Sequence, residues 1–315
     1  MTISDLREAP PGPITASGAV LAPGGPRPLV ASNPWRLMAR RFRRDKVAMA
    51  GAAVVLLISL SAVFAPLLAR YPIDPVLDRA TLSQARQPPS WRHPFGTDDV
   101  GRDELTRILY GGRISLALGL SVAVVSMTVG TAVGAVAGYC RGWIDHALMR
   151  LTDLLLVIPG LAILMIAQKG LGGSAVVIVG VLSLLFWRGV ARVVRSMTLS
   201  LREREFTEAA RASGASAARI VVTELLPNAV GVICVQAPLA VAAAILTEST
   251  LSFLGFGLAP PAASWGSMLA QSRGAVGTHL AYLVYSPGLA ILLTVLAINI
   301  VGNGLRDAFD PESGS

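Results

Sequence analysis

Charge, cysteine and lysine are all scarce in this sequence. Only 15% of its 315 residues are charged, whereas a typical soluble domain carries roughly 25%. Cys140 and Cys234 are the only cysteines, and Lys46 and Lys169 are the only lysines. Both cysteines lie in or beside apolar runs, so we expect neither a disulfide framework nor a metal site. The low charge excludes a disordered chain and most soluble domains.

Apolar residues make up 53% of the chain and give it a mean hydropathy of +0.60. A membrane-spanning helix needs about 20 consecutive, mostly apolar residues. Runs of about that length lie at 47–69, 114–140, 147–168, 170–195, 225–247 and 281–305. The sequence therefore predicts an all-α membrane protein with six transmembrane helices in a domain over residues 47–311.

The first 46 residues contain no such run. Residues 1–33 are rich in proline and glycine and cannot build a core, so we expect a disordered cytoplasmic tail and no signal peptide. Residues 34–46 carry a cluster of arginines, while Trp35, Met38 and Phe42 lie three and four residues apart. That pattern predicts a basic amphipathic helix on the inner membrane surface, with a plain stop-transfer charge cluster as the alternative.

Arginine and lysine are distributed unevenly between the expected loops. If the N-terminus is inside, the cytoplasmic segments hold 17 of them and the outer segments hold 9. Because basic residues favour the cytoplasmic side, both termini are expected there. The net charge of +8 could suit nucleic acid, but these side chains border membrane-length runs. We therefore expect contact with membrane lipid and no nucleic-acid partner.

Few ionisable residues lie inside the apolar runs, and the candidates are Asp153, Arg188 and Glu248. Such residues serve either a transport pathway or a structural bond, and both interpretations stay open here. Arg150 lies three residues before Asp153 and is its expected partner on a helix. The runs carry no chain of carboxylates or histidines of the kind expected in a proton-driven pump, so the energy source is expected elsewhere.

Small residues and prolines mark the second, third and fifth apolar runs. Gly130, Gly134 and Gly138 repeat every four residues, a spacing that lets two helices approach closely in lipid. A glycine-rich sequence without a specific seam is the alternative. Pro159 and Pro238 interrupt the third and fifth runs, where each removes a backbone hydrogen bond and can kink the helix.

The longest expected cytoplasmic loop, 197–226, has the pattern of a docking element. Charged residues predict a soluble helix, alanines leave a low face that can enter a groove on a partner, and a glycine can end the helix in a left-handed turn. The residues assigned to this role are Arg204, Glu205, Glu208, Ala209, Ala210, Gly214 and Ala215. The loop resembles the EAA coupling loop of bacterial ABC importer permeases, with an ordinary surface helix pair as the alternative.

The resemblance extends over residues 36–311. Its further segments are 93–99 (HPFGTDD), 101–103 (GRD), 109–116 (LYGGRISL), 251–257 (LSFLGFG), 264–266 (SWG) and 304–311 (GLRDAFDP). In this order they resemble the C-type permease subunits of bacterial dipeptide, oligopeptide and nickel ABC importers. Glu224 departs from that family, which often has His there. His93 is expected to be structural rather than a metal ligand.

The resemblance implies a type I ABC importer permease in the bacterial inner membrane, with outer loops at 70–112 and 251–280. It implies a transport subunit without catalytic activity or cofactor of its own. The implied partners are a homologous permease, two cytoplasmic ATPase subunits that bind ATP and Mg, and an extracytoplasmic binding protein. In agreement, the chain has no GxxxxGK[ST] phosphate loop.

Dipeptides or oligopeptides are the implied cargo, with nickel, glutathione or haem as alternatives on the same architecture. Glu248 could then meet the α-amino group of a peptide, or accept hydrogen bonds from the backbone amides of Ser252 or Phe253. We favour the structural role, because a turn rich in Ser, Thr and Gly follows it. An ATP-independent secondary transporter is the alternative of another class.

Overall fold

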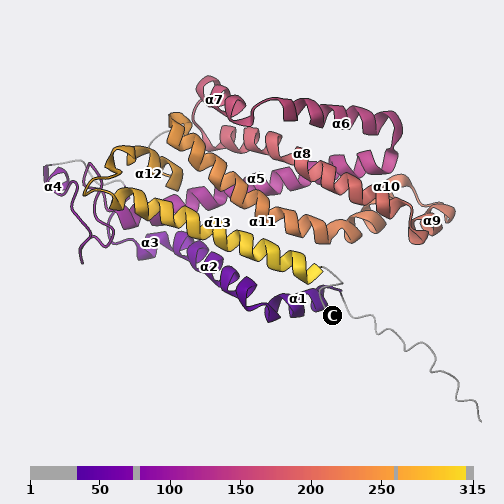
Figure 1. Ribbon diagram of the computed structural model, residues 1–315, viewed down its shortest axis with the longest axis horizontal. Coiled ribbons are helices and arrows are strands. Elements are labelled where there is room, and N and C mark those ends of the chain that lie inside the picture. The colour runs from indigo at the N-terminus through magenta and orange to yellow at the C-terminus, as the bar shows by residue number, and fades with distance from the viewer. Residues whose placement is uncertain (1–33, 74–78, 259–261, 310–315) are drawn as a thin grey trace, which may run out of the picture.

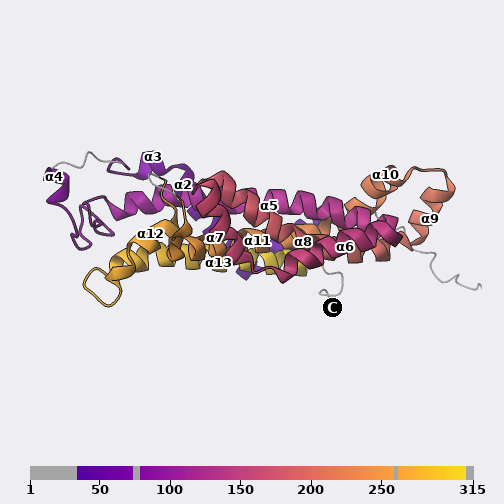
Figure 2. The ribbon, with the colours of Figure 1, turned by 90° about the horizontal axis from the view of Figure 1, so that it is seen from above.

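The structure, a computed structural model, describes residues 34–73, 79–258 and 262–309. The regular secondary structure within these residues is helical. One isolated antiparallel β-bridge in them joins Thr97 and Asp103. The long helices run lengthwise in an elongated bundle (Figures 1 and 2). The tail expected over 1–33 lies outside the described residues.

Five helical segments are long and apolar enough to cross a membrane. They are α2 (Lys46–Val63), α5 (Glu104–Cys140), α8 (Ala175–Arg202), α11 (Leu226–Leu251) with its flanking turns, and α13 (Tyr282–Phe309). The pair α6 (Gly142–Val157) and α7 (Gly160–Leu171) passes the same test and supplies the sixth span. The described part of the chain thus confirms the all-α fold with six spans.

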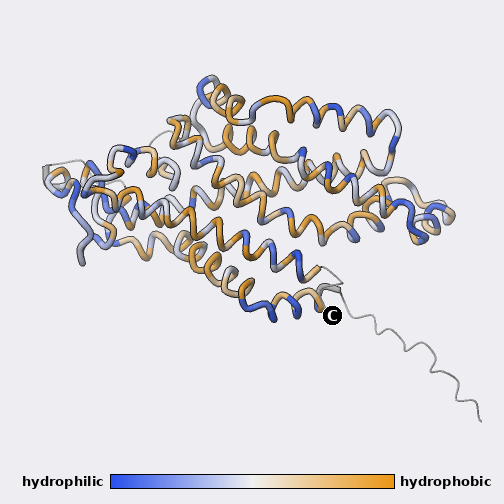
Figure 3. The backbone as a smooth tube through the Cα atoms, viewed as in Figure 1, coloured by the Kyte–Doolittle hydropathy of each residue, from blue (hydrophilic) through white to orange (hydrophobic). Residues whose placement is uncertain are grey.

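Shorter elements lie between and before the spans. They are α1 (Pro34–Arg44), α3 (Ala65–Leu68), α4 (Arg79–Leu82), α9 (Glu205–Ala212), α10 (Ala217–Ile220) and α12 (Trp265–Gln271). Two π-helical turns, Val221–Leu225 and Ser252–Phe256, extend α11 at its two ends. Helices α4 and α12 lie at one end of the bundle and α9 and α10 at the other, and hydrophilic residues are concentrated at these two ends (Figures 1 and 3).

The basic segment near the N-terminus forms helix α1, as expected. Asp45 then separates it from α2, because its side-chain oxygen accepts the backbone N–H groups of Val47 at 2.9 Å and Ala48 at 3.1 Å. This is an N-cap that satisfies two of the free amides of the first turn. The placement of α1 on the membrane surface stays a prediction.

Helix α5 begins ten residues earlier than the expected span, at Glu104 rather than at 114. Asp103 caps it by accepting the N–H of Thr106 at 2.8 Å. The expectation was wrong because the charges around Arg107 were taken as a loop. In the fold, Arg107 is buried and donates to Asp98 at 2.7 Å, so the helix continues through it. Helix α8 likewise continues to Arg202, past the expected end at 195.

The third span is broken at Pro159, where α6 and α7 meet at 81°. Proline has no N–H, so the carbonyl four residues earlier, on Leu155, loses its helical partner. The guanidinium of Arg188 on α8 donates to that carbonyl. In lipid an unsatisfied carbonyl costs several kcal/mol, so this bond stabilises the break. Pro238, by contrast, lies inside α11 and does not interrupt it.

Ion pairs fasten α6 to α8. Asp153 pairs with Arg192 rather than with Arg150, so the expected pair within one helix is wrong. Asp145 binds Arg195 through both carboxylate oxygens, at 2.5 and 2.6 Å. The error arose because i,i+3 spacing on one helix was considered without the helix that packs against it. Asp153 and Arg188 thus both lie in the contact between α6–α7 and α8.

The glycines of α5 form a seam against α8. A Cβ atom added at Gly130 would lie 2.6 Å from the carbonyl oxygen of Trp187, and one at Gly134 would lie 2.5 Å from that of Ala191. At Gly138 it would lie 2.7 Å from Cβ of Thr198. Only glycine permits the two helices to approach this closely over two turns. The structure therefore supports a specific glycine seam over a glycine-rich sequence without one.

We expect Gly134→Ala to destabilise the protein by about 1–3 kcal/mol, because the new methyl group forces α5 and α8 apart. Gly180→Ala on α8 is the control, since no atom lies within 4 Å of the added carbon. That variant should be neutral or gain up to about 1 kcal/mol from helix propensity. Thermal unfolding of the purified protein in detergent measures both, and equal midpoints for the two variants would contradict the seam.

Candidate functional site: a projecting helix pair and a polar pocket

Helices α9 and α10 project beyond the ends of the long helices at one end of the molecule (Figures 1 and 2). Helix α9 follows α8 after Glu203 and Arg204, and α10 runs through the turn Val221–Leu225 into α11. The pair is therefore attached directly to two spans. We call residues 203–220 the projecting pair.

A left-handed glycine joins the two helices. Gly214 has φ of +79°, its N–H donates to the carbonyl of Arg211 at 3.0 Å, and the N–H of Ala215 donates to that of Ala210 at 3.1 Å. These two bonds form a Schellman motif, which satisfies carbonyls at the end of α9 and reverses the chain. The turn predicted from the sequence at Gly214 is confirmed.

Two buried residues hold the projecting pair on the bundle. Thr207 is fully buried, and its hydroxyl donates to the carbonyl of Leu201 at 2.9 Å, at the end of α8. Ile220 is buried at the end of α10, which Ser216 caps. The role of Thr207 could not be predicted from the sequence, since a lone threonine among charged residues gives no pattern.

The residues predicted for docking lie together on this pair. Arg204, Glu205, Glu208, Ala209 and Gly214 are exposed, and Ala210 and Ala215 are partly buried against the turn. The outward side thus combines charged side chains with small ones, which a partner surface can approach closely. Their role in docking stays a prediction.

At the opposite end, Asp98 organises the loop before α5. One of its oxygens accepts the N–H groups of Val100 at 3.0 Å and Arg102 at 2.8 Å, and the other accepts from Arg107 at 2.7 Å. Arg107 also donates to Gln271 at 2.7 Å, which ties this loop to the end of α12. Asp98 therefore fixes the loop to the bundle as a cap and as an ion-pair partner.

His93 lies in the same loop and bonds within it. Its Nδ1 is 2.8 Å from a carboxylate oxygen of Asp103, and both side chains are buried. Tyr71 stacks on the imidazole with 4.7 Å between ring centroids. No group of three His, Cys, Asp or Glu that could hold a metal ion occurs in the part of the chain that the structure describes. These contacts fit a structural histidine.

Glu248 links the end of α11 to the start of α12. It is 1% exposed, and its Oε1 accepts the hydroxyls of Ser252 and Ser264, each at 2.7 Å. Ser264 is also the N-cap of α12. The partners are thus serine hydroxyls and not the backbone amides of Ser252 or Phe253 that the sequence analysis proposed. This geometry suits a structural bond, and the role of Glu248 stays a prediction.

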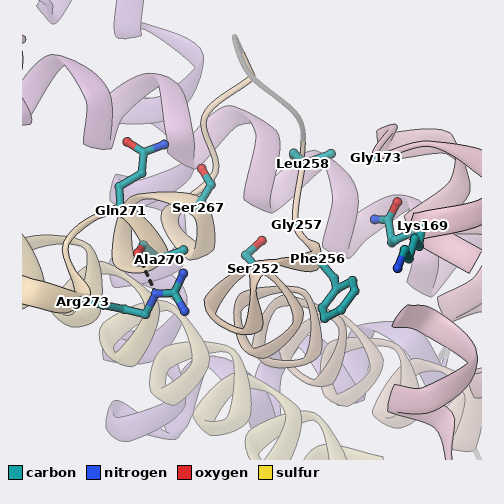
Figure 4. A pocket seen from close by; sticks show the side chains of 12 residues that line it. Lys169, Gly173, Ser252, Phe256, Gly257, Leu258, Ser267, Ala270, Gln271 and Arg273 are labelled. Atoms are coloured by element: carbon teal, nitrogen blue, oxygen red, sulfur yellow. Dashed lines mark hydrogen bonds between the residues drawn. The ribbon is translucent and has the colours of Figure 1, made fainter. Parts of the chain in front are cut away.

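A pocket of about 670 Å³ lies beside this link, at the α12 end of the molecule (Figure 4). Its polar lining side chains include Gln168, Lys169, Ser252, Ser267, Gln271 and Arg273, and Phe256 and Leu258 add apolar surface. Lys169 comes from α7 on one side, and Gln271 and Arg273 come from the α12 side (Figure 4). The volume of the pocket lies in the range that is usual for small-molecule binding sites.

The projecting pair and the pocket both belong to a part of the chain that resembles a known protein family. The sequence profile described as the binding-protein-dependent transport system inner membrane component matches residues 130–314, more than half of the chain. The chain belongs to this family. A second profile, the N-terminal transmembrane domain of oligopeptide transport permease C, matches residues 33–89. The projecting pair and the pocket both lie inside the part that matches the transport family.

Members of the transport family that resemble this chain do so over most of their length. The oligopeptide transport system permease protein OppC of Mycobacterium tuberculosis is 41% identical over 281 residues, which cover 89% of this chain and 95% of the relative. OppC of Bacillus subtilis is 37% identical over 278 residues, covering 88% and 90%. The dipeptide transport system permease protein DppC of Bacillus subtilis is 38% identical over 273 residues, covering 87% and 84%.

We expect Glu248→Ala to destabilise the protein by about 1–3 kcal/mol, because two buried serine hydroxyls lose their acceptor. Glu248→Gln keeps one carbonyl oxygen and should lose less. Glu203→Ala is the control, since it removes an exposed carboxylate whose surface ion pair contributes little. Thermal unfolding measures all three, and an unchanged midpoint in Glu248→Ala would remove the structural assignment.

Proposed function

We propose that this chain is a permease subunit of an ATP-driven ABC importer that carries dipeptides or oligopeptides across the inner membrane. The relatives named as oligopeptide and dipeptide permeases support the peptide cargo. The observation that carries the coupling role is the projecting pair, an exposed helix pair locked by one turn and anchored on α8 and α11.

In this proposal the energy enters through the projecting pair. Two cytoplasmic ATPase subunits bind ATP with Mg and receive α9 in a groove, where the low alanine face allows close contact. When the ATPase subunits close, the pair moves as a unit, because the Schellman turn and the buried Thr207 and Ile220 oppose its bending. The motion then passes into α8 and α11 as a rigid-body movement.

The pathway forms between this chain and a homologous permease. An extracytoplasmic binding protein delivers the cargo at the α12 end, where the loop before α5 and helix α12 are held together by Arg107 and Gln271. The run from α10 to the turn after α11, Ala217–Phe256, is one apolar helical segment of 40 residues. It joins the projecting pair to the pocket, so movement at one end reaches the other.

Nickel, glutathione and haem are alternative cargoes for the same architecture. The names of the relatives favour peptides over them. A secondary transporter, the alternative of another class, would need free ionisable groups inside the spans. Asp153 and Arg188 are bound to Arg192 and to the carbonyl of Leu155, which favours structural work over ion coupling.

The coupling role is tested by Gly214→Val in the assembled transporter. No atom lies within 4 Å of a side chain added at Gly214, so the effect comes from the backbone alone. A β-branched residue at positive φ costs roughly 1–2 kcal/mol or more and opens the turn. We expect ATP hydrolysis to continue while peptide uptake falls at least tenfold.

The matched control at this position is Gly214→Asn, because asparagine tolerates the left-handed region. It should keep most of the coupled uptake. Both variants are reconstituted with their partners in proteoliposomes, and ATP hydrolysis and uptake are measured on the same sample. Near-normal uptake by a stably assembled Gly214→Val complex would refute the coupling role.

The proposed topology places both termini and the projecting pair in the cytoplasm. Single cysteines at Ser90 and Ser216, both exposed, report the two sides once Cys140 and Cys234 are replaced by serine. We expect an impermeant maleimide to label Ser90→Cys and not Ser216→Cys in intact cells, and to label both after lysis. Labelling of position 216 from outside would overturn the orientation.

A further inference from the structure

The pocket at the α12 end is positively charged. Lys169 and Arg273 line it from opposite sides (Figure 4), and none of its described lining residues is Asp or Glu. Glu248 is bonded to Ser252, one of the lining residues, but does not line the pocket itself. The groups that face the pocket therefore favour an anion.

One lining side chain is buried without a partner. Gln168 is 5% exposed, and in the described part of the chain neither its amide nitrogen nor its amide oxygen has a hydrogen-bond partner. A buried amide without partners costs about 1–3 kcal/mol, so its presence calls for a group that satisfies it. Gln168 precedes Lys169 and lines the same pocket, so a ligand there can accept from both.

The groups facing Lys169 are held in place. Arg273 donates through Nε to the carbonyl of Ala270 at 2.9 Å, and its guanidinium lies 5.6 Å from the ring centroid of Phe253. These two contacts orient the side chain of Arg273 and leave its terminal nitrogens available to donate to a ligand. Gln271 accepts from Arg107 through its amide oxygen, which leaves its amide nitrogen as a donor. Prior fixation lowers the entropy lost when a ligand binds.

We propose that this pocket binds the C-terminal carboxylate of the peptide cargo, with Lys169 and Arg273 as the charged donors and Gln168 as the buried polar contact. A carboxylate accepts from several donors at once and pairs well with a guanidinium. The volume of about 670 Å³ admits the terminal residue of a peptide as well as its carboxylate. The inference rests on the proposed function and adds a specificity site within the permease itself.

Two matched peptides, one with a free C-terminal carboxylate and one with a C-terminal amide, test the site. Uptake is measured in proteoliposomes that hold the full transporter, with binding protein at saturating concentration. In Lys169→Gln and Arg273→Gln we expect uptake of the free acid to fall roughly tenfold and uptake of the amide to change little. Lys169→Arg keeps the charge and should restore most of the uptake.

Arg150→Gln is the matched control, because it removes an exposed cation of α6 that does not line the pocket. It should leave both peptides unaffected. An equal fall for acid and amide in Lys169→Gln would overturn the inference, since the cations would then serve the fold or a lipid headgroup. If the wild-type complex imports neither peptide, the proposed function fails instead.

A second measurement decides independently of uptake. A carbodiimide converts the carboxylate of the peptide to an O-acylisourea, and an amine in contact with it displaces the urea and forms an amide bond. During turnover we expect the labelled peptide to be joined to Lys169, as mapped by mass spectrometry, and the product to be lost in Lys169→Arg. An amidated peptide has no C-terminal carboxylate to activate, so it cannot be joined to Lys169 through that end and sets the background. Absence of the product at Lys169, in a complex that imports the peptide, would refute carboxylate binding there.

Discussion

The close approach of α5 and α8 is the contact on which the rest of the architecture depends. Gly130, Gly134 and Gly138 bring the two backbones close together over two turns near the C-terminal end of α5. Lipid offers no hydrophobic drive between helices, so van der Waals packing at such a seam has to supply the association. Helix α8 in turn carries α9 and receives the ion pairs from α6, so both features depend on where the seam places it.

The need to give buried polar groups hydrogen-bond partners explains several further features of the structure. In hydrocarbon each free carbonyl or charge is costly, and several of the polar groups within the spans are bonded to a second polar group. Arg188 covers the carbonyl that Pro159 leaves without a partner, which turns a potential defect into a stable break in the third span. Glu248 likewise stabilises the connection between α11 and α12, because it accepts hydrogen bonds from the hydroxyls of Ser252 and Ser264.

The projecting pair and the pocket lie at opposite ends of the molecule, but one continuous element joins them. The segment Ala217–Phe256 begins in the projecting pair and ends in the wall of the pocket. At a rise of about 1.5 Å per residue, its 40 residues span roughly 60 Å. Although Gly255 near its end is not helical, this largely helical segment connects the two ends directly, which fits the rigid-body movement proposed for transport.

The sequence by itself determined the six spans, the turn at Gly214 and the family resemblance, and it marked Pro159 and Pro238 alike as sites where a helix can kink. These are local properties, because apolar run length, a left-handed glycine and a missing N–H act on neighbouring residues. Only the tertiary structure decided that Asp153 binds Arg192, that Arg107 is buried within α5, and that Gln168, Lys169 and Arg273 line one pocket. Asp153 and Arg192 lie 39 residues apart in the chain, and Arg273 lies far from Lys169, so only the packing of the helices brings the first pair within bonding distance and the second into one cavity.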